Sequence, residues 1–157
     1  MSSNARFAEA AAALGYSFDG ELKIGGNYVP LLRDGNIVYV SGQVPRVGST
    51  VVVTGRVGEQ VTLAQAQLAA KVCAMRALAL LKGELGSLEK VRQVLRVTVY
   101  TQSAANFTRQ SEVADGASEL LHMVLGSAGK HTRTSVGVYQ LPKNASVELD
   151  LVALVNV

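Results

Sequence analysis

The chain has 157 residues, of which 48% are apolar and 17% charged, and its formal net charge is +3. This length is enough for one domain that buries roughly two thirds of its unfolded surface without disulfides or metal ions. The 15 Lys and Arg residues are never adjacent to one another, so nucleic acid is not expected as a partner. The high apolar fraction instead suggests surface reserved for another subunit.

The only cysteine, Cys73, lies between Val72 and Ala74 and is expected to be a small buried side chain. A single cysteine excludes an internal disulfide and a cysteine-based metal site. No apolar run approaches the roughly 20 residues that a membrane span needs, and the N-terminus lacks an export pattern. We therefore expect a cytoplasmic protein.

The first half of the chain predicts one helix followed by strands. The alanine-rich stretch from about Asn4 to Leu14 is typical of a helix and ends at Gly15. Two extended runs, Tyr28–Leu32 and Ile37–Ser41, flank an Asp-Gly turn and predict a hairpin. A short β-branched run from Thr50 to Thr54 follows.

The second half predicts two long helices among strands. After the capping residue Thr62, the segment Leu63–Leu85 is rich in Ala and Leu and predicts a helix of about six turns. The remaining predicted elements are a strand over Val91–Tyr100, a helix from about Asn106 to Leu125, and strands over Thr132–Tyr139 and Ser146–Val155.

The predicted final strand has two different faces. Five apolar residues share one face, and the other face begins with Glu148 and Asp150. The order of elements indicates an α+β fold, with two long helices on one face of a mixed sheet. Because no further helix is available for the opposite face, other subunits are the expected cover. No linker or repeat divides residues 1–157, so one domain is expected.

Arg133 and Glu148 are the main candidates for chemistry. They begin the last two predicted strands, which a proline-containing connection joins. A guanidinium binds a carboxylate through two parallel hydrogen bonds, and a glutamate can transfer protons. The pair therefore predicts a carboxylate clamp beside an acid/base group.

Other candidate sites are weaker. We expect no acidic residue to orient His122 or His131, so no histidine-based catalytic or metal site is expected. The glycines from Gly55 to Gly58 lack the lysine and the spacing of a phosphate loop.

Four sequence blocks carry a family resemblance through their joint order and spacing. They are Gly26-Asn27-Tyr28-Val29, Val40-Ser41-Gly42-Gln43-Val44-Pro45, Arg133-Thr134-Ser135-Val136, and Leu141-Pro142-Lys143 leading to Val147-Glu148-Leu149. Together they resemble the YjgF/RidA family, also called endoribonuclease L-PSP, over roughly Gly26 to Val155. Residues 1–25 are then an N-terminal extension, typical of a divergent branch. The resemblance implies a fold like bacillary chorismate mutase and a barrel-like homotrimer with active sites between subunits.

The resemblance also implies a function. Archetypal members hydrolyse reactive enamine and imine intermediates such as 2-aminoacrylate to 2-oxo acids and ammonia, without a cofactor. Arg133 matches the arginine that binds the substrate carboxylate, and Glu148 matches the glutamate that positions water. Tyr28 and Ser41-Gly42 match the opposite wall of the site.

This chain departs from the archetype at two positions of the expected site. Ser135 replaces a cysteine of the substrate-binding region, and Ala105 falls where the family has an asparagine. Two alternatives stay open. One is a non-catalytic trimer that binds a small carboxylate or metabolite. The other, ranked lower, is an endoribonuclease, because the sequence has neither a basic cluster nor an evident histidine pair.

Overall fold

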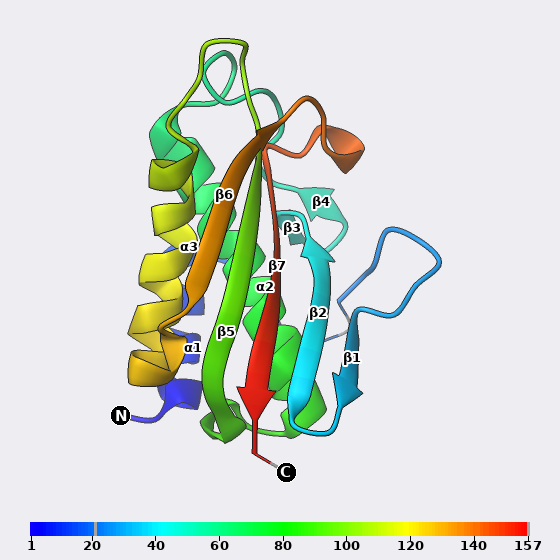
Figure 1. Ribbon diagram of the computed structural model, residues 1–157, viewed down its shortest axis with the longest axis vertical. Helices are drawn as coiled ribbons and strands as arrows, with labels where there is room; N and C mark the ends of the chain where they lie inside the picture. Colours follow the sequence, from blue (N-terminus) through cyan, green and yellow to red (C-terminus); the bar gives the residue numbers. More distant parts are fainter. Residues whose placement is uncertain (21, 157) are drawn as a thin grey trace.

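The computed structural model describes residues 1–20 and 22–156, and its centre is a five-stranded mixed sheet (Figure 1). Three helices lie on one face of this sheet, which confirms the expected α+β class. The strand order is β1-β2-β7-β5-β6. The strands are β1 (Leu31–Asp34), β2 (Ile37–Gln43), β5 (Val91–Gln102), β6 (Thr132–Val138) and β7 (Val147–Val155), and the helices are α1 (Ser3–Leu14), α2 (Leu63–Leu85) and α3 (Gln110–Leu125).

Smaller elements surround this core. Strands β3 (Arg46–Val47) and β4 (Thr50–Val51) form a separate two-stranded ribbon. The short 3-10 helices are η1 (Leu88–Lys90), η2 (Gly126–Gly129) and η3 (Pro142–Asn144). Figure 1 shows η3 and the ribbon near the same end of β2.

The helices follow from local signals and close packing. Thr62 and Gln65 form a capping box at the start of α2, and Gly86 ends the helix in the left-handed conformation. Helix α3 packs against α2 at Gly116, where an added Cβ would lie 2.5 Å from the Gln67 carbonyl oxygen. Helix α1 packs against α3 and contributes Phe7 and Ala10 to the core.

The alternation predicted for the last strand is confirmed. The side chains of Val147, Leu149, Leu151, Ala153 and Val155 are buried, whereas Glu148, Asp150, Val152 and Leu154 are partly exposed on the other face. The buried set faces the helices, because α2 packs against β7. Glu148 and Asp150 therefore point to the open face of the sheet.

The last two strands, β6 and β7, follow each other in the chain but are not neighbours in the sheet. Strand β6 pairs with β5 in parallel, and β7 pairs with β5 in antiparallel on its other side. The connection through η3 therefore crosses over the end of β5 and does not form a hairpin. This arrangement decides where the two main candidate residues lie.

Three predicted boundaries also differ. Strand β1 begins at Leu31 and not at Tyr28, because Pro30 has no N–H for the ladder and the preceding residues form a loop. Helix α3 begins at Gln110 and not near Asn106, after a turn in which Phe107 N–H bonds the Ala104 carbonyl. The run from Thr50 contributes only Thr50–Val51 to the separate ribbon.

The open face of the sheet carries apolar side chains. Leu32, Tyr39, Leu95 and Val136 are 62%, 52%, 37% and 38% exposed. In the described part of the chain, all three α-helices lie on the other side. None of those helices is long and apolar enough to cross a membrane. Cys73 is fully buried, and burial raises the pKa of its thiol.

Candidate functional site

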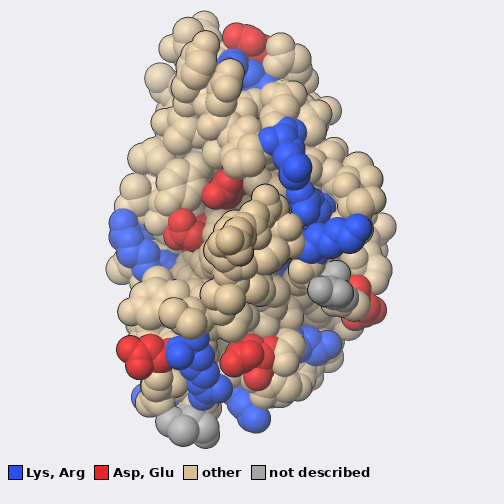
Figure 2. Space-filling view, turned by 90° about the vertical axis from the view of Figure 1, so that its right-hand side faces the viewer, with Lys and Arg blue, Asp and Glu red and all other residues tan. Residues whose placement is uncertain are grey.

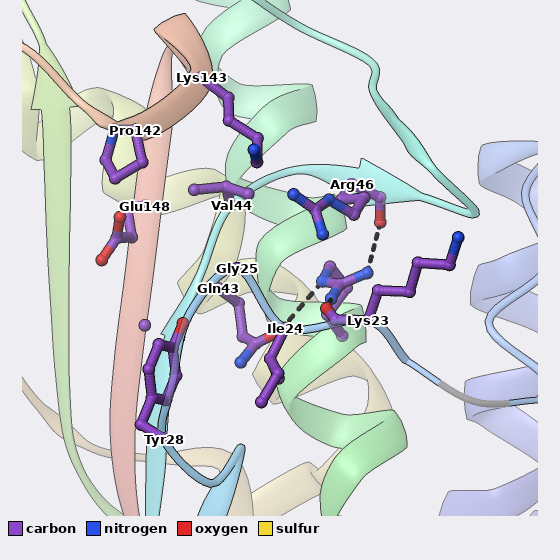
Figure 3. A pocket seen from close by; sticks show the side chains of 12 residues that line it. Lys23, Ile24, Gly25, Tyr28, Gln43, Val44, Arg46, Pro142, Lys143 and Glu148 are labelled. Carbon is purple, nitrogen blue, oxygen red and sulfur yellow. Dashed lines mark hydrogen bonds between the residues drawn. The ribbon is translucent and has the colours of Figure 1, made fainter.

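A cavity of about 530 Å³ lies where the loop before β1, the end of β2, the β3 strand and η3 meet. Its volume is within the roughly 300–1,000 Å³ range of small-molecule sites. Three residues expected at the site, Tyr28, Gly42 and Glu148, line it. Figure 3 shows Glu148 on one wall, Tyr28 below it and Lys143 above.

The Glu148 carboxylate lies against strand β2 at Gly42, in the space that a side chain at this position would occupy. A Cβ added at Gly42 would collide with Glu148 Oε2. The register of β2 against β7 shifts between Val40 and Gln43, so the ladder is irregular at this point. Gly42 thus has a definite function in the structure, which is to leave space for the Glu148 carboxylate.

The surroundings of Glu148 favour its protonated form. Burial, and secondarily the negative charge of Asp150, raise the pKa of Glu148 above the ordinary carboxyl value. The Tyr100 hydroxyl on the neighbouring strand donates to Asp150 Oδ2 at 2.9 Å and therefore does not hold Glu148. A carboxylate with a raised pKa is a stronger proton acceptor once ionised, as general acid/base catalysis requires.

Ser41 supports the cavity from outside its wall. Its hydroxyl donates to the Val29 carbonyl oxygen at 2.8 Å, and its backbone N–H donates to the Pro30 carbonyl oxygen at 2.9 Å. These bonds tie the loop that carries Tyr28 to strand β2. Ser41 therefore positions Tyr28 and does not itself line the cavity.

The cavity also gathers basic residues that sequence reasoning missed. Its lining includes Lys23, Arg46, Arg76 and Lys143 alongside the single acid Glu148. On this side of the molecule, Lys and Arg side chains form a band beside an uncharged centre (Figure 2). The basic residues are far apart in the sequence, and only the fold brings them together.

Arg76 forms the floor of this basic group. It is 3% exposed, and its Nε donates to Gln43 Oε1 at 3.0 Å. Its two Nη atoms each donate at 2.8 Å to the carbonyl oxygens of Arg46 and Lys23. Burial lowers the pKa of Arg76, but an arginine stays charged in proteins. A sequence signal for it existed, because Arg76 is a charged residue inside the apolar run of α2.

Arg133 and Ser135 lie away from this cavity. In the parallel register, Arg133 is opposite Val97 and Ser135 is opposite Val99, and both valines are buried under the helices. Arg133 Nη1 donates to Asp115 Oδ1 and Ser118 Oγ at 2.9 Å each. Its Nη2 donates to Ser111 Oγ at 2.9 Å.

The expected clamp of Arg133 beside Glu148 is therefore not formed within one chain. Glu148 pairs with Tyr100 on the open face, whereas Arg133 is on the helix face of the edge strand β6. Because successive side chains of a strand point to opposite faces, this separation follows directly from the register. A site that uses both residues needs them from two different chains.

The two histidines of the chain lie beside each other in the fold. The rings of His122 and His131 lie with centroids 5.5 Å apart. His131 Nδ1 contacts the Gly129 carbonyl oxygen at 2.6 Å, and its Nε2 contacts Ser118 Oγ at 2.8 Å. Both nitrogens of His131 are therefore engaged by the protein. Within residues 1–20 and 22–156, no three His, Cys, Asp or Glu side chains form a group that could hold a metal ion.

Comparisons with known proteins agree on one family. The family model described as Endoribonuclease L-PSP matches residues 19–155. The Trypanosoma cruzi protein TCP17 is 39% identical over 131 residues, which cover 83% of this chain and 82% of the relative.

Two solved structures match almost the whole chain. Atu1372 from Agrobacterium tumefaciens, whose function is unknown, is 39% identical with a TM-score of 0.88 and covers 99% of this chain and 95% of its own. A candidate endoribonuclease from Shewanella oneidensis is 25% identical with a TM-score of 0.89 and covers 99% and 100%. The YjgF protein of E. coli, at 19% identity and a TM-score of 0.64, shares the fold over 88% of this chain and 95% of its own.

The contact between Gly42 and Glu148 leads to a structural prediction. In Gly42→Ala, the new Cβ displaces the Glu148 carboxylate from β2, and a crystal structure will show it in a different rotamer. Gly25→Ala is the matched control, since Gly25 lines the same cavity and has no atom within 4 Å of an added Cβ. An unmoved Glu148 carboxylate in Gly42→Ala would contradict the assigned function of Gly42.

Proposed function

The chain belongs to the endoribonuclease L-PSP family, and we propose that it hydrolyses reactive enamine or imine acids to 2-oxo acids and ammonia. The observation that carries the proposal is the position of Glu148. Its carboxylate lies in a small-molecule cavity among cationic side chains, and its pKa is raised. These are the properties expected of a general base that serves an anionic substrate.

The reaction follows from a single acid/base group. An enamine first takes a proton on carbon and becomes an iminium ion, which is the protonated imine. Glu148 then removes a proton from water while the water oxygen bonds to the iminium carbon, and a neutral carbinolamine forms. The protonated Glu148 gives its proton to the nitrogen, and then takes the proton of the new hydroxyl group as the carbonyl forms, the C–N bond breaks and ammonia leaves. No electrons are exchanged with a cofactor, so the proposed reaction uses none.

Arg133 is proposed to bind the substrate carboxylate from a neighbouring subunit. Its guanidinium is on the helix face of β6, so it cannot reach Glu148 of its own chain across the sheet. A homotrimer with sites between subunits would bring the two together, with Ser135 beside Arg133. The exposed apolar side chains of the open face support such an assembly, because a second copy would cover them.

Substrate binding would then compete with the contacts that Arg133 makes inside its own chain. The Arg133 side chain is 20% exposed, and its partner Asp115 is 52% exposed. Exposed ion pairs stabilise proteins by only about 0–1 kcal/mol. Replacing the Asp115 carboxylate by a substrate carboxylate would therefore cost little free energy from the lost ion pair.

Two other functions use the same structure differently. A non-catalytic trimer that binds a small carboxylate would need the cationic residues but not Glu148. An endoribonuclease that uses histidines for acid/base cleavage would need free imidazole nitrogens, whereas both nitrogens of His131 are engaged. Imine hydrolysis is the function that uses the raised pKa of Glu148. The buried, unpaired Cys73 fits the cytoplasmic location that the sequence predicts.

The central test measures keto-acid release when the protein is added to a serine or threonine dehydratase. We expect acceleration by the wild-type protein and a loss of about 100- to 10,000-fold in Glu148→Gln, the range for a general base. Glu84→Gln, an exposed acid on α2, is the control and should retain full activity. No acceleration with several amino-acid substrates would exclude the proposed reaction, and 2-oxo acid binding without acceleration would favour the binding protein.

A second prediction concerns the pH dependence of this activity. The base must be ionised, so kcat/KM should fall as the pH drops through the raised pKa of Glu148. Because the charge of Asp150 contributes to that increase, Asp150→Asn should lower the pKa of Glu148 and move the acid limb to lower pH. The Asn side chain can still accept the Tyr100 hydrogen bond. If the acid limb of the pH profile does not move in Asp150→Asn, the group that titrates in the profile is not Glu148.

A further inference from the structure

The cavity has more positive charge than one carboxylate requires. Four of its lining residues are cationic and one is acidic, so the lining has a net charge of +3 when Glu148 is ionised. The two ion pairs between side chains of the described residues are Arg109 with Glu112 and Arg133 with Asp115, and neither includes a cavity residue. The charge of the cavity is therefore not balanced by these pairs.

Arg46 is the cation with the least satisfied environment. It is 8% exposed, and its buried Nε has no hydrogen-bond partner. An unpartnered buried polar group costs about 1–3 kcal/mol, and a charged group costs more. A protein tolerates such a group where a ligand supplies the missing acceptor.

The position of Arg46 is fixed by its backbone. The Arg46 carbonyl oxygen accepts a hydrogen bond from Arg76 Nη1, and Arg46 pairs with Val51 in the β3–β4 ribbon. Figure 3 shows the Arg46 guanidinium extending toward the cavity interior. The N–H groups of Arg76, in contrast, are used in hydrogen bonds to Gln43, Arg46 and Lys23. Arg46 is thus preorganised, with donors available to a ligand.

Lys143 approaches the same region from the opposite wall. It adopts a left-handed conformation with φ of 59°, which is uncommon for a residue other than glycine. The following residue, Asn144, also has positive φ and is anchored by Gln102 Nε2 on its Oδ1 at 2.8 Å. In Figure 3 the Lys143 side chain descends toward the Arg46 guanidinium, whereas Lys23 points away. Two like charges that face one cavity repel each other unless an anion lies between them.

We propose that Arg46 and Lys143 form a second anionic subsite, so that the ligand of this cavity bears a second carboxylate or a phosphate beside its imino-acid group. This inference rests on the proposed function for the identity of the first group. The reacting carbon would lie beside Glu148, and the second anionic group would supply the acceptor that Arg46 Nε lacks. Carboxylate and phosphate are both recognised by a guanidinium and an ammonium.

The test is equilibrium binding by titration calorimetry with three 2-oxo acids as probes. Pyruvate has one anionic group, 2-oxoglutarate adds a carboxylate, and 3-phosphohydroxypyruvate adds a phosphate. We expect the wild-type protein to bind at least one dianion about 10- to 100-fold more tightly than pyruvate, as one charge-assisted hydrogen bond allows. The dianion that binds more tightly identifies the second group.

The variant Arg46→Met should remove this preference, because it should weaken the binding of the second anionic group more than the binding of pyruvate. Methionine retains much of the side-chain volume and removes the buried Nε that has no hydrogen-bond partner. Arg92→Met, an exposed arginine on β5, makes the same change in net charge away from the cavity and should keep the preference. Thermal unfolding of both variants establishes that they are folded.

The binding results test the second subsite independently of the proposed imine hydrolysis. A dianion preference that Arg46→Met abolishes supports the subsite, even if no imine is hydrolysed and the proposed function fails. Equal binding of pyruvate and both dianions, no binding of either dianion, or a preference that survives Arg46→Met would each overturn the subsite. The subsite would then be excluded even if imines are hydrolysed. The same comparison can be made for kcat/KM. Amino-acid oxidases generate an imine with one carboxylate from alanine and an imine with two carboxylates from aspartate.

Discussion

The alternation of side chains between the two faces of the central sheet determines where the candidate functional residues lie. Along β7, every second residue is buried under the helices, and the residues between them, Glu148 among them, point to the open face. The parallel pairing of β6 with β5 places Arg133 on the helix face. A change of register by one residue would exchange these faces and bury a charged side chain. The positions of Glu148 and Arg133 are therefore fixed by core packing.

The cavity combines this constraint with three features of the surrounding loops. Gly42 leaves space for the Glu148 carboxylate, Ser41 fixes the loop of Tyr28, and Arg76 fixes the ribbon that carries Arg46. Each feature is a backbone contact that involves few residues. As a result, the Glu148 carboxylate lies in a preorganised cationic environment. The same features support the proposal that the ligand of this site is an anionic acid.

The sequence predicted those parts of the structure that depend on local patterns. The two long helices, the Asp-Gly hairpin and the two faces of the last strand all follow from periodicity and turn residues near in sequence. The relative placement of Arg133 and Glu148 could not be predicted, because nothing local indicates that β5 lies between their strands. The convergence of Arg46 and Arg76 was also missed, since their contact joins residues 30 positions apart. The one indication of this cluster in the sequence was Arg76, a charged residue within the apolar run of α2.

The central claim is that one subunit supplies Glu148 and its neighbour supplies Arg133. The most direct test is to co-express differently tagged Glu148→Gln and Arg133→Met chains and to assay the purified mixed oligomers. Each variant alone should be nearly inactive. In a mixed trimer of either composition, one of the three sites between subunits contains both native residues, so about a third of wild-type activity should return. Mixed oligomers that are as inactive as the separate variants would contradict the shared site.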